Sequence, residues 1–313
     1  MTSIYKPEGY IIDTPENREY ISSVNSLEYA KSAGIILEGR ASLCDSSHNL
    51  VVDFGTFKGI IPKKEAAYST DGSDIRDIAV ITRVGKPVCF KVKSIEKNGS
   101  IPEIILSRRD AQSECFENYI SDLKCGDIID ARITHIEPFG AFCDIGCGII
   151  ALLPVDCISV SRISNPKERF SVGDRIKAAV KVNDRQTGRI TLTHKELLGT
   201  WQQNADMFSA GETAAGIIRS VEPYGIFVEL TPNLAGLAEW CEGTSPGQSA
   251  AVYIKSIIPE KMKIKLVIVD SHFSDTPQRK PEYYISEGHM DFWKYSPDGC
   301  EKDVYTDFTE SLS

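Results

Sequence analysis

The sequence contains no CxxC motif although it has nine cysteines, and its five histidines have no metal-ligand spacing with them. It also lacks a glycine-rich phosphate loop, a nucleophile elbow and paired metal-binding carboxylates. These absences argue against zinc binding, nucleotide hydrolysis and serine-hydrolase chemistry. A dyad of His135 with Cys143 is the remaining enzymatic arrangement, but strand alternation points Cys143 into the core. We therefore expect no catalytic residue, no metal site and no cofactor.

Long apolar runs are absent as well. No stretch is long enough to span a bilayer, and no apolar run near residue 1 suggests a signal peptide. The cysteines are scattered, and several occupy apolar strand positions, which is typical of small core residues in a reduced compartment. These features predict a cytoplasmic protein without a membrane partner.

The chain has no basic excess, since 35 Lys and Arg residues face 44 Asp and Glu residues, for a net charge of −9. The acidic surplus lies at the two ends: residues 1–38 hold three basic and six acidic residues, and residues 270–313 hold four and ten. The core between them is neutral. If such a core binds nucleic acid, it must rely on local patches and stacking, with modest affinity and a shallow salt dependence.

An internal repeat is the most informative feature that is present. Residues 137–154 recur in register, without a gap, as residues 222–239, at an offset of 85 residues. Both copies keep two aromatic residues, one in a Pro-aromatic-Gly turn and one in the strand that follows. The pairs are Phe139 with Phe142 and Tyr224 with Phe227. A neighbouring helix or repeat could cover these rings, but large exposed aromatics more often mark a contact surface.

Strand alternation assigns faces within the two copies. In the copy at residues 137–154, which we call the middle copy, Cys143 and its apolar neighbours face inward, while Phe142 and Asp144 share the outward, polar phase. In the copy at residues 222–239, which we call the last copy, Phe227 and Glu229 share that phase. We therefore expect each strand ring to lie on the polar face of its sheet.

Cations follow on the same face of the middle copy. Residues 172–197 read as two strands joined by a turn, and their outward phase and turn contain Lys177, Lys181, Asp184, Arg185 and Arg189. Any one of these residues could be an ordinary solvated side chain. Together with the aromatic rings they suit single-stranded nucleic acid, because bases stack on rings and phosphates need cations.

The middle copy resembles the S-one RNA-binding domain, which the bacterial ribosomal protein S-one carries in tandem. The motifs that match in order are Gly126-Asp127, Phe139-Gly140-Ala141-Phe142, Leu152-Leu153-Pro154, Val172-Gly173-Asp174 and Asp184 through Arg189-Ile190-Thr191-Leu192. The resemblance implies a five-stranded barrel of the oligonucleotide/oligosaccharide-binding (OB) type. It also implies RNA contacts at Phe139, Phe142, Asp184 and Arg189. Pro154 stands where many members of the family have a histidine.

The other two copies depart further from this pattern. In the last copy Lys263 takes the place of Arg189, and Ile258 takes that of Asp184. A further copy, which we call the first copy, precedes these two and is visible at residues 50–66. Its Gly55 and Gly59 keep the pattern of the repeat, but His48 and Val51 fall where the rings are expected. The resemblance implies that such a first repeat serves as a scaffold or docking element, with RNA binding toward the middle of the chain.

We expect a mainly β protein of three tandem five-stranded OB-fold barrels joined by helical connectors, with an N-terminal helix and a C-terminal extension. The helix should run from about Thr14 to Ala33. The connectors should pack an apolar stripe on a barrel, or less readily form a partner groove. The expected segments are an N-terminal helical segment (1–33), a degenerate repeat (34–109), a connector (110–124), the RNA-binding repeat (125–195), a connector (196–209), a third repeat (210–269) and an acidic aromatic extension (270–313).

The extension contains a small hairpin pattern around residues 283–300, and it could form either a cap on the last barrel or a partner surface. For the whole chain, the leading interpretation is a non-enzymatic binder of single-stranded RNA, such as messenger RNA, that acts at the ribosome, with the small subunit as a further partner. The alternative is a protein-interaction scaffold of degenerate OB-fold repeats without strong RNA affinity. The sequence leaves the oligomeric state open.

Overall fold

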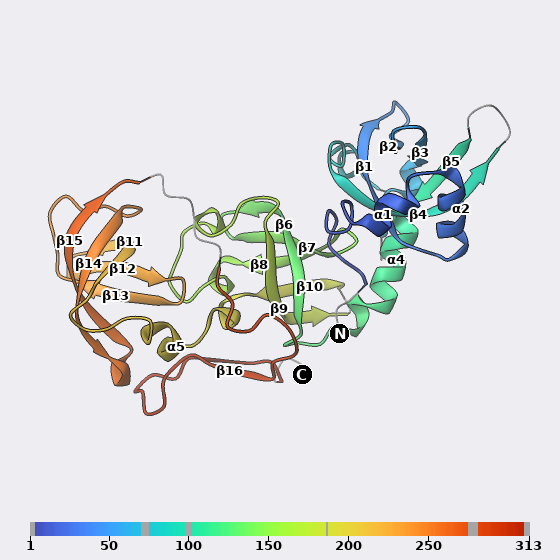
Figure 1. The fold of residues 1–313 in the computed structure, drawn as a ribbon. Coiled ribbons are helices and arrows are strands. Elements are labelled where there is room, and N and C mark those ends of the chain that lie inside the picture. The colour runs from blue at the N-terminus through green and yellow to red at the C-terminus, as the bar shows by residue number, and fades with distance from the viewer. Residues whose placement is uncertain (1–3, 70–74, 98–101, 186, 275–280, 310–313) are drawn as a thin grey trace.

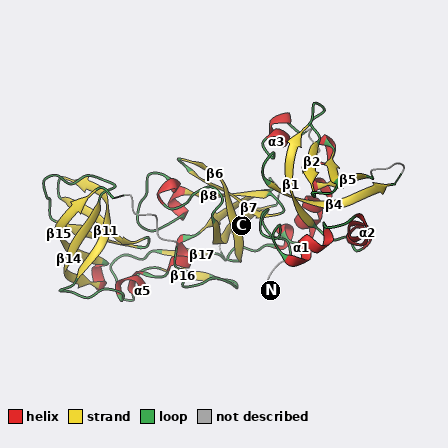
Figure 2. Ribbon diagram, turned by 45° about the horizontal axis from the view of Figure 1, so that its top comes forward, coloured by secondary structure: helices red, strands yellow, loops and turns green. Residues whose placement is uncertain are grey.

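Three closed five-stranded barrels follow one another along the chain (Figure 1). The structure is a computed structural model, and it describes residues 4–69, 75–97, 102–185, 187–274 and 281–309. Short helices lie between and beside the barrels, while strands form most of the regular structure (Figure 2). The predicted fold class, tandem OB-type barrels, is confirmed.

The first barrel is built from β1 to β5, in the sheet order β1-β2-β3-β5-β4. The strands are β1 (Leu37–Cys44), β2 (Leu50–Asp53), β3 (Lys58–Ile61), β4 (Pro87–Glu96) and β5 (Glu103–Ser107). A 3-10 turn (Lys63–Glu65) and the short helix α3 (Asp77–Ile81) connect β3 to β4.

The helix expected over residues 14–33 is two helices, α1 (Pro15–Tyr20) and α2 (Val24–Ser32). Thr14 caps α1 by accepting from the Asn17 amide, and proline occupies the first turn, as expected. Ser23 starts a second helix, because its side chain accepts from the Ser26 amide while its own backbone is extended. This second cap interrupts the predicted single helix.

The middle and third barrels repeat the same connectivity. The middle barrel contains β6 (Ile128–Glu137), β7 (Gly140–Gly146), β8 (Ile149–Pro154), β9 (Arg175–Asp184) and β10 (Arg189–Thr193), with 3-10 turns at Val155–Cys157 and Pro166–Glu168. The third contains β11 (Thr213–Glu222), β12 (Gly225–Thr231), β13 (Leu234–Ala238), β14 (Ser249–Ile258) and β15 (Lys263–His272), with a 3-10 turn at Pro259–Lys261.

The helical connectors pack their apolar side chains into the barrel that follows them. The first is α4 (Arg108–Asn118) with a 3-10 turn (Ile120–Asp122), and its Ala111, Cys115 and Ile120 belong to the core of the middle barrel. The second is a 3-10 turn (Lys195–Leu198) with α5 (Trp201–Ala205), and its Leu197 and Trp201 join the core of the third barrel. The connectors therefore hold neighbouring barrels together.

The segment that precedes α1 is buried between the first and middle barrels. Its Glu8 carboxylate pairs with Arg108, whose Nε lies 2.6 Å away, and its backbone amide donates to Asp144 at 2.7 Å. The amides of Gly146, the last residue of β7, and of Gly148, in the turn that follows, also donate to Asp144. Asp144 is therefore buried, so the expectation that it shares an exposed face with Phe142 is wrong. Alternation correctly predicts on which face of the strand a side chain lies, but it cannot show that the N-terminal segment covers that face at Asp144.

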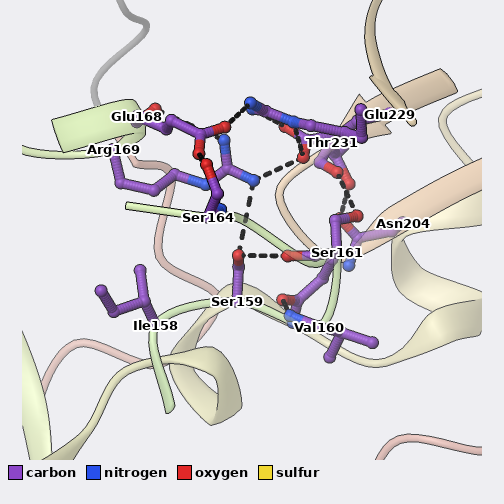
Figure 3. Close-up of polar contacts among 12 residues, drawn as sticks. Ile158, Ser159, Val160, Ser161, Ser164, Glu168, Arg169, Asn204, Glu229 and Thr231 are labelled. Carbon is purple, nitrogen blue, oxygen red and sulfur yellow. Dashed lines mark hydrogen bonds and ion pairs between the residues drawn. The ribbon is translucent and has the colours of Figure 1, made fainter. Parts of the chain in front are cut away.

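A second polar junction lies between the middle and third barrels (Figure 3). Arg219 donates to the two carboxylate oxygens of Glu229 at 2.8 and 3.1 Å, and Arg169 of the middle barrel also pairs with Glu229. Glu168 accepts from Arg219 at 2.5 Å. Glu229 is thus buried rather than exposed beside Phe227 as expected, because two arginines converge on its carboxylate.

Residues 281–309, which we call the C-terminal strap, run across the middle and third barrels. It contains the predicted kind of hairpin, although its strands lie later, at β16 (Phe292–Lys294) and β17 (Tyr305–Asp307). The Ile128 amide of the middle barrel donates to Gly288, and the Tyr295 hydroxyl donates to the Asn233 carbonyl of the third barrel at 2.5 Å. The strap therefore caps the last barrel, as one of the two interpretations predicted, since Trp293 and Tyr295 join that barrel's core, and it also contacts the middle barrel. Residues 275–280 and 310–313 of the extension lie outside the described residues.

Candidate nucleic-acid interface

The sheet register places the two rings of the middle repeat on one exposed face. His135 of β6 pairs with Phe142 of β7, Phe142 pairs with Leu152 of β8, and Leu152 pairs with Thr191 of β10. We call these four residues the outward row of the middle barrel. Phe139, in the turn before β7, is 57% exposed, and its ring centroid lies 6.1 Å from that of Phe142 at an interplanar angle of 89°. The two rings form one edge-to-face pair.

The glycine between these rings allows the close approach of β7 to β8. A Cβ atom on Gly140 would lie 2.7 Å from the carbonyl oxygen of Leu153. Gly225 of the third barrel has the same role, since a Cβ there would lie 2.6 Å from the carbonyl oxygen of Ala238. The retained Pro-aromatic-Gly motif thus combines a ring at the turn with a glycine that the strand pairing requires.

A third ring belongs to the middle surface, and the sequence interpretation missed it. The imidazole of His135 stacks beside Phe142 with centroids 6.1 Å apart and planes inclined by 29°. It is exposed, and its Nε2 lies 2.7 Å from the carboxylate of Glu137. Alternation along residues 128–137 would place His135 inward with Ile129 and Ile133, but a β-bulge between Ile133 and His135 turns its ring outward, opposite Phe142.

The cationic edge of this surface lies at the β9–β10 turn. Arg189 pairs in register with Asp184, and both Arg189 and Arg185 are exposed. The Asp184 carboxylate accepts from the Thr187 hydroxyl at 2.5 Å and from the Thr187 amide at 3.2 Å. Asp184 therefore shapes the turn that carries the two arginines.

The two lysines of β9 differ in their surroundings. Lys181 is half-buried, with Nζ 3.2 Å from the Cys157 sulfur just after β8. Burial alone would lower the pKa of Lys181, but Cys157 and Asp156 hold that pKa above its ordinary value, so the amine stays charged.

Lys177 lies elsewhere on the barrel. Its Nζ is 2.6 Å from Asp130, and its backbone amide donates to the Tyr283 hydroxyl of the C-terminal strap. Asp130 stands five residues before His135 on β6, which corresponds to about 17 Å along a strand. The structure therefore does not bring Lys177 together with the rings.

The third barrel reproduces the ring geometry with different neighbours. Tyr224 is 71% exposed, and its centroid lies 6.2 Å from that of Phe227 at 86°. The outward row of this barrel, by the same register, is Ser220, Phe227, Leu237 and Lys265. Lys263 is exposed opposite Ile258, at the position that Arg189 and Asp184 occupy in the middle barrel. Trp240, which the sequence interpretation did not single out, is 61% exposed just after β13.

The first barrel has no ring in the corresponding row. Leu43 pairs with Val51, Val51 with Ile60, and Ile60 with Ile105. His48 lies in the β1–β2 turn with φ of 60°, and its Nδ1 is 3.7 Å from Asp77. The outward row of the first barrel is thus entirely aliphatic.

Two further properties of the structure concern metal binding and membrane spans. Among the residues that the structure describes, His, Cys, Asp and Glu side chains form no group of three or more that could hold a metal ion. No helix within the same residues is long and apolar enough to cross a membrane.

Comparisons with known proteins found a matching domain family and similar proteins. Residues 122–195 match the S1 RNA binding domain family. The small ribosomal subunit protein bS1 of Staphylococcus aureus (strain COL) is 32% identical over 237 residues, which cover 70% of this chain and 58% of that protein. A bS1 homolog from Bacillus cereus is 27% identical over 232 residues, covering 72% and 57%. The chain thus spans somewhat more than half the length of these relatives, and it resembles the bS1 family.

Among solved structures, a multidomain protein with nucleic acid binding domains from Streptococcus pneumoniae is 13% identical. The similarity covers 75% of this chain and 73% of that one, with a TM-score of 0.26.

Proposed function

We propose that this chain, which resembles the bS1 ribosomal proteins, is a non-enzymatic cytoplasmic protein that binds single-stranded RNA through the outward face of its middle barrel. The observation that carries the proposal is the cluster of Phe139, Phe142 and His135, three neighbouring rings on a face whose β10 member, Thr191, stands two residues from the exposed Arg189. Unstacked bases stack on such rings, and the phosphates between them need nearby cations.

The contributions of the other predicted residues follow from their positions. Lys181 supplies a charge next to β8, and Asp184 positions the arginine turn. Lys177 takes no part, because its amine is paired with Asp130 away from the rings. On the third barrel, Tyr224, Phe227 and Lys263 form a second and weaker surface, since the Asp184 position is occupied by Ile258.

The chemistry of this surface favours single strands. In a duplex the bases are stacked on one another and cannot reach the rings, and the neutral core offers little long-range attraction to the denser charge of a duplex. Stacking is also tolerant of base identity, because every base has a π-face. We expect weak sequence preference and a shallow salt dependence.

A competition experiment tests this proposal. A fluorescent unstructured RNA is bound to the full chain, and fluorescence anisotropy follows its displacement by the unlabelled single strand or by the duplex of the same sequence, at two salt concentrations. The proposed function predicts that the single strand displaces the probe at lower concentration. Tighter binding of the duplex would contradict it and would favour a scaffold whose rings serve another contact.

A second function is favoured by the aliphatic outward row of the first barrel. Leu43 is exposed there, and Val51 and Ile60 are partly exposed, so this face suits a protein partner better than RNA. We propose that it docks to a protein of the ribosomal small subunit. Leu43→Glu should then reduce co-sedimentation of the full chain with ribosomes while RNA affinity is retained. Loss of RNA affinity with unchanged co-sedimentation would reverse this division of labour.

A further inference from the structure

A cleft of about 490 Å³ separates the first barrel from the middle barrel. This volume falls within the range of roughly 300–1,000 Å³ that is usual for ligand sites. One wall comes from α3, α4 and the segment after β3, and the other comes from the β7–β8 and β9–β10 turns. The residues that matter for its chemistry are Tyr68, Arg76, Arg83, Phe116, Ile150 and Gly188.

The cleft is continuous with the outward face of the middle barrel. Thr191 of β10 and Leu152 of β8 are partners in a parallel pair, so two residues earlier Arg189 lies beside Ile150 on the same face. Ile150 is 39% exposed and also lines the cleft, as does Gly188, the neighbour of Arg189. A strand that passes over Phe142 and Leu152 therefore reaches the cleft within about 7 Å of Leu152.

The cleft contains cationic and aromatic side chains of the kinds that bind nucleotides. Arg76 is exposed at its edge, and Arg83, which forms a long ion pair of 3.7 Å with Glu8, is partly exposed beside it. Guanidinium groups bind phosphate through paired N–H donors. The rings of Tyr68 and Phe116 meet on the wall with centroids 5.7 Å apart and planes inclined by 39°, and they offer an aromatic surface for a base.

A buried glutamine fixes the two walls relative to each other. The Gln112 side-chain oxygen accepts from the Tyr68 amide, and its nitrogen donates to the Cys147 carbonyl of the middle barrel, both at 2.9 Å. Arg108 also lines the cleft, but its guanidinium is bound to Glu8 and is buried. The walls are thus held in place without using Arg76 or the Tyr68 ring, which leaves both to face the cleft.

We propose that a single-stranded RNA bound on the middle barrel continues into this cleft, where Arg76 and Arg83 bind a phosphate and Tyr68 stacks on the next base. The inference rests on the proposed function. It also gives the first barrel a part in RNA binding, through the side that faces the middle barrel rather than through its aliphatic outward row. The bound strand is therefore longer than one barrel face accommodates.

Full-length variants and oligouridylates of two lengths test the inference. The short RNA, about 4 nucleotides, covers one barrel face, and the long RNA, about 12 nucleotides, extends beyond it. Arg76→Ala should weaken binding of the long RNA about fivefold or more, leave the short RNA nearly unchanged, and reduce the salt slope for the long RNA by about 0.7, as expected for one lost phosphate contact. The Arg76 side chain makes no capping hydrogen bond to α3, so the substitution spares that helix.

Two matched variants make the outcome decisive. Lys31→Ala removes an equal charge from an exposed position on α2, and it should leave both affinities unchanged. Tyr68→Leu should weaken only the long RNA. Equal effects of Arg76→Ala and Lys31→Ala on the long RNA would overturn the cleft site, as would equal losses for the two RNA lengths. If Phe142→Ala also has no effect on either RNA, the proposed function itself fails, whereas a loss with Phe142→Ala alone removes only the cleft.

Discussion

The middle and first barrels share a sheet order and differ mainly on their outward rows. Both bury apolar residues on the inward face, as in Cys143 and Leu192 of the middle barrel and Val52 and Leu106 of the first. On the outward face one barrel has a row with an imidazole and a phenyl ring, and the other has only aliphatic side chains. The inward phase of these strands therefore specifies the barrel, while the outward phase is free to specify the ligand.

The largest effect should come from removing the central ring of the middle row. Stacking contributes about 1–3 kcal/mol per base, so Phe142→Ala should weaken binding of an RNA of about ten nucleotides roughly tenfold or more. Anisotropy titration measures this loss, and thermal unfolding checks that the fold is retained.

Val51→Ala is the matched control, because Val51 occupies the equivalent register position in the first barrel. It should leave RNA affinity unchanged. If both substitutions reduce affinity equally, the two outward rows are not functionally distinct and the comparison fails.

A smaller effect is expected from the third barrel, which keeps the rings but loses the acidic partner of the cationic turn. Phe227→Ala should weaken the same RNA about two- to fivefold, because its stacked base is held by fewer neighbouring contacts. Titration of the double variant with Phe142→Ala sharpens the result. A loss from Phe227→Ala that exceeds the loss from Phe142→Ala would make the third barrel the main site.

The smallest effect concerns how the first barrel is attached. Glu38 of β1 is buried, and its Oε2 accepts from the Gly9 and Ile12 amides at 3.0 and 2.9 Å. Burial, together with the nearby Glu8 charge, raises the pKa of Glu38 to about 8. A carboxyl group with a raised folded-state pKa contributes stability that is complete below its unfolded pKa and is lost as the pH rises through the folded value.

The unfolding temperature of the parent should therefore fall between about pH 5 and about pH 8 and level off above that, and Glu38→Gln should reduce this fall by about 4 °C or more. The amide keeps an acceptor for both backbone donors but cannot ionise. Part of the pH dependence should remain in the variant, because burial also raises the pKa of Asp144, to about 7. Identical pH profiles for parent and variant would show that Glu38 does not ionise across this range.

The sequence predicted the elements that depend on local pattern. The three barrels, the connectors and the ring pairs follow from alternation, turn residues and the repeat at an offset of 85 residues. The burial of Asp144 and Glu229 could not be predicted in this way, because the Glu8 segment and Arg169 that cover them are distant in sequence. The path of the C-terminal strap across two barrels depends on similar long-range contacts.

The candidate surface was also only partly predictable. Ring pairs and cations could be recognised by residue type. That Lys177 lies away from the rings is seen only from its contacts with Asp130 and Tyr283. His135 joined the surface through cross-strand register, which a single strand does not reveal. Register and covering segments, rather than residue type, decided which side chains lie together.

Photocrosslinking tests the central claim most directly. Thiouridine-substituted RNA is irradiated in complex with the full chain, and mass spectrometry identifies the crosslinked peptides. The account predicts adducts concentrated on the peptides that contain His135, Phe139 and Phe142, fewer on those around Tyr224 and Phe227, and none on the first-barrel strands that carry Val51 and Ile60. Adducts concentrated on those first-barrel strands, with none near Phe142, would contradict it.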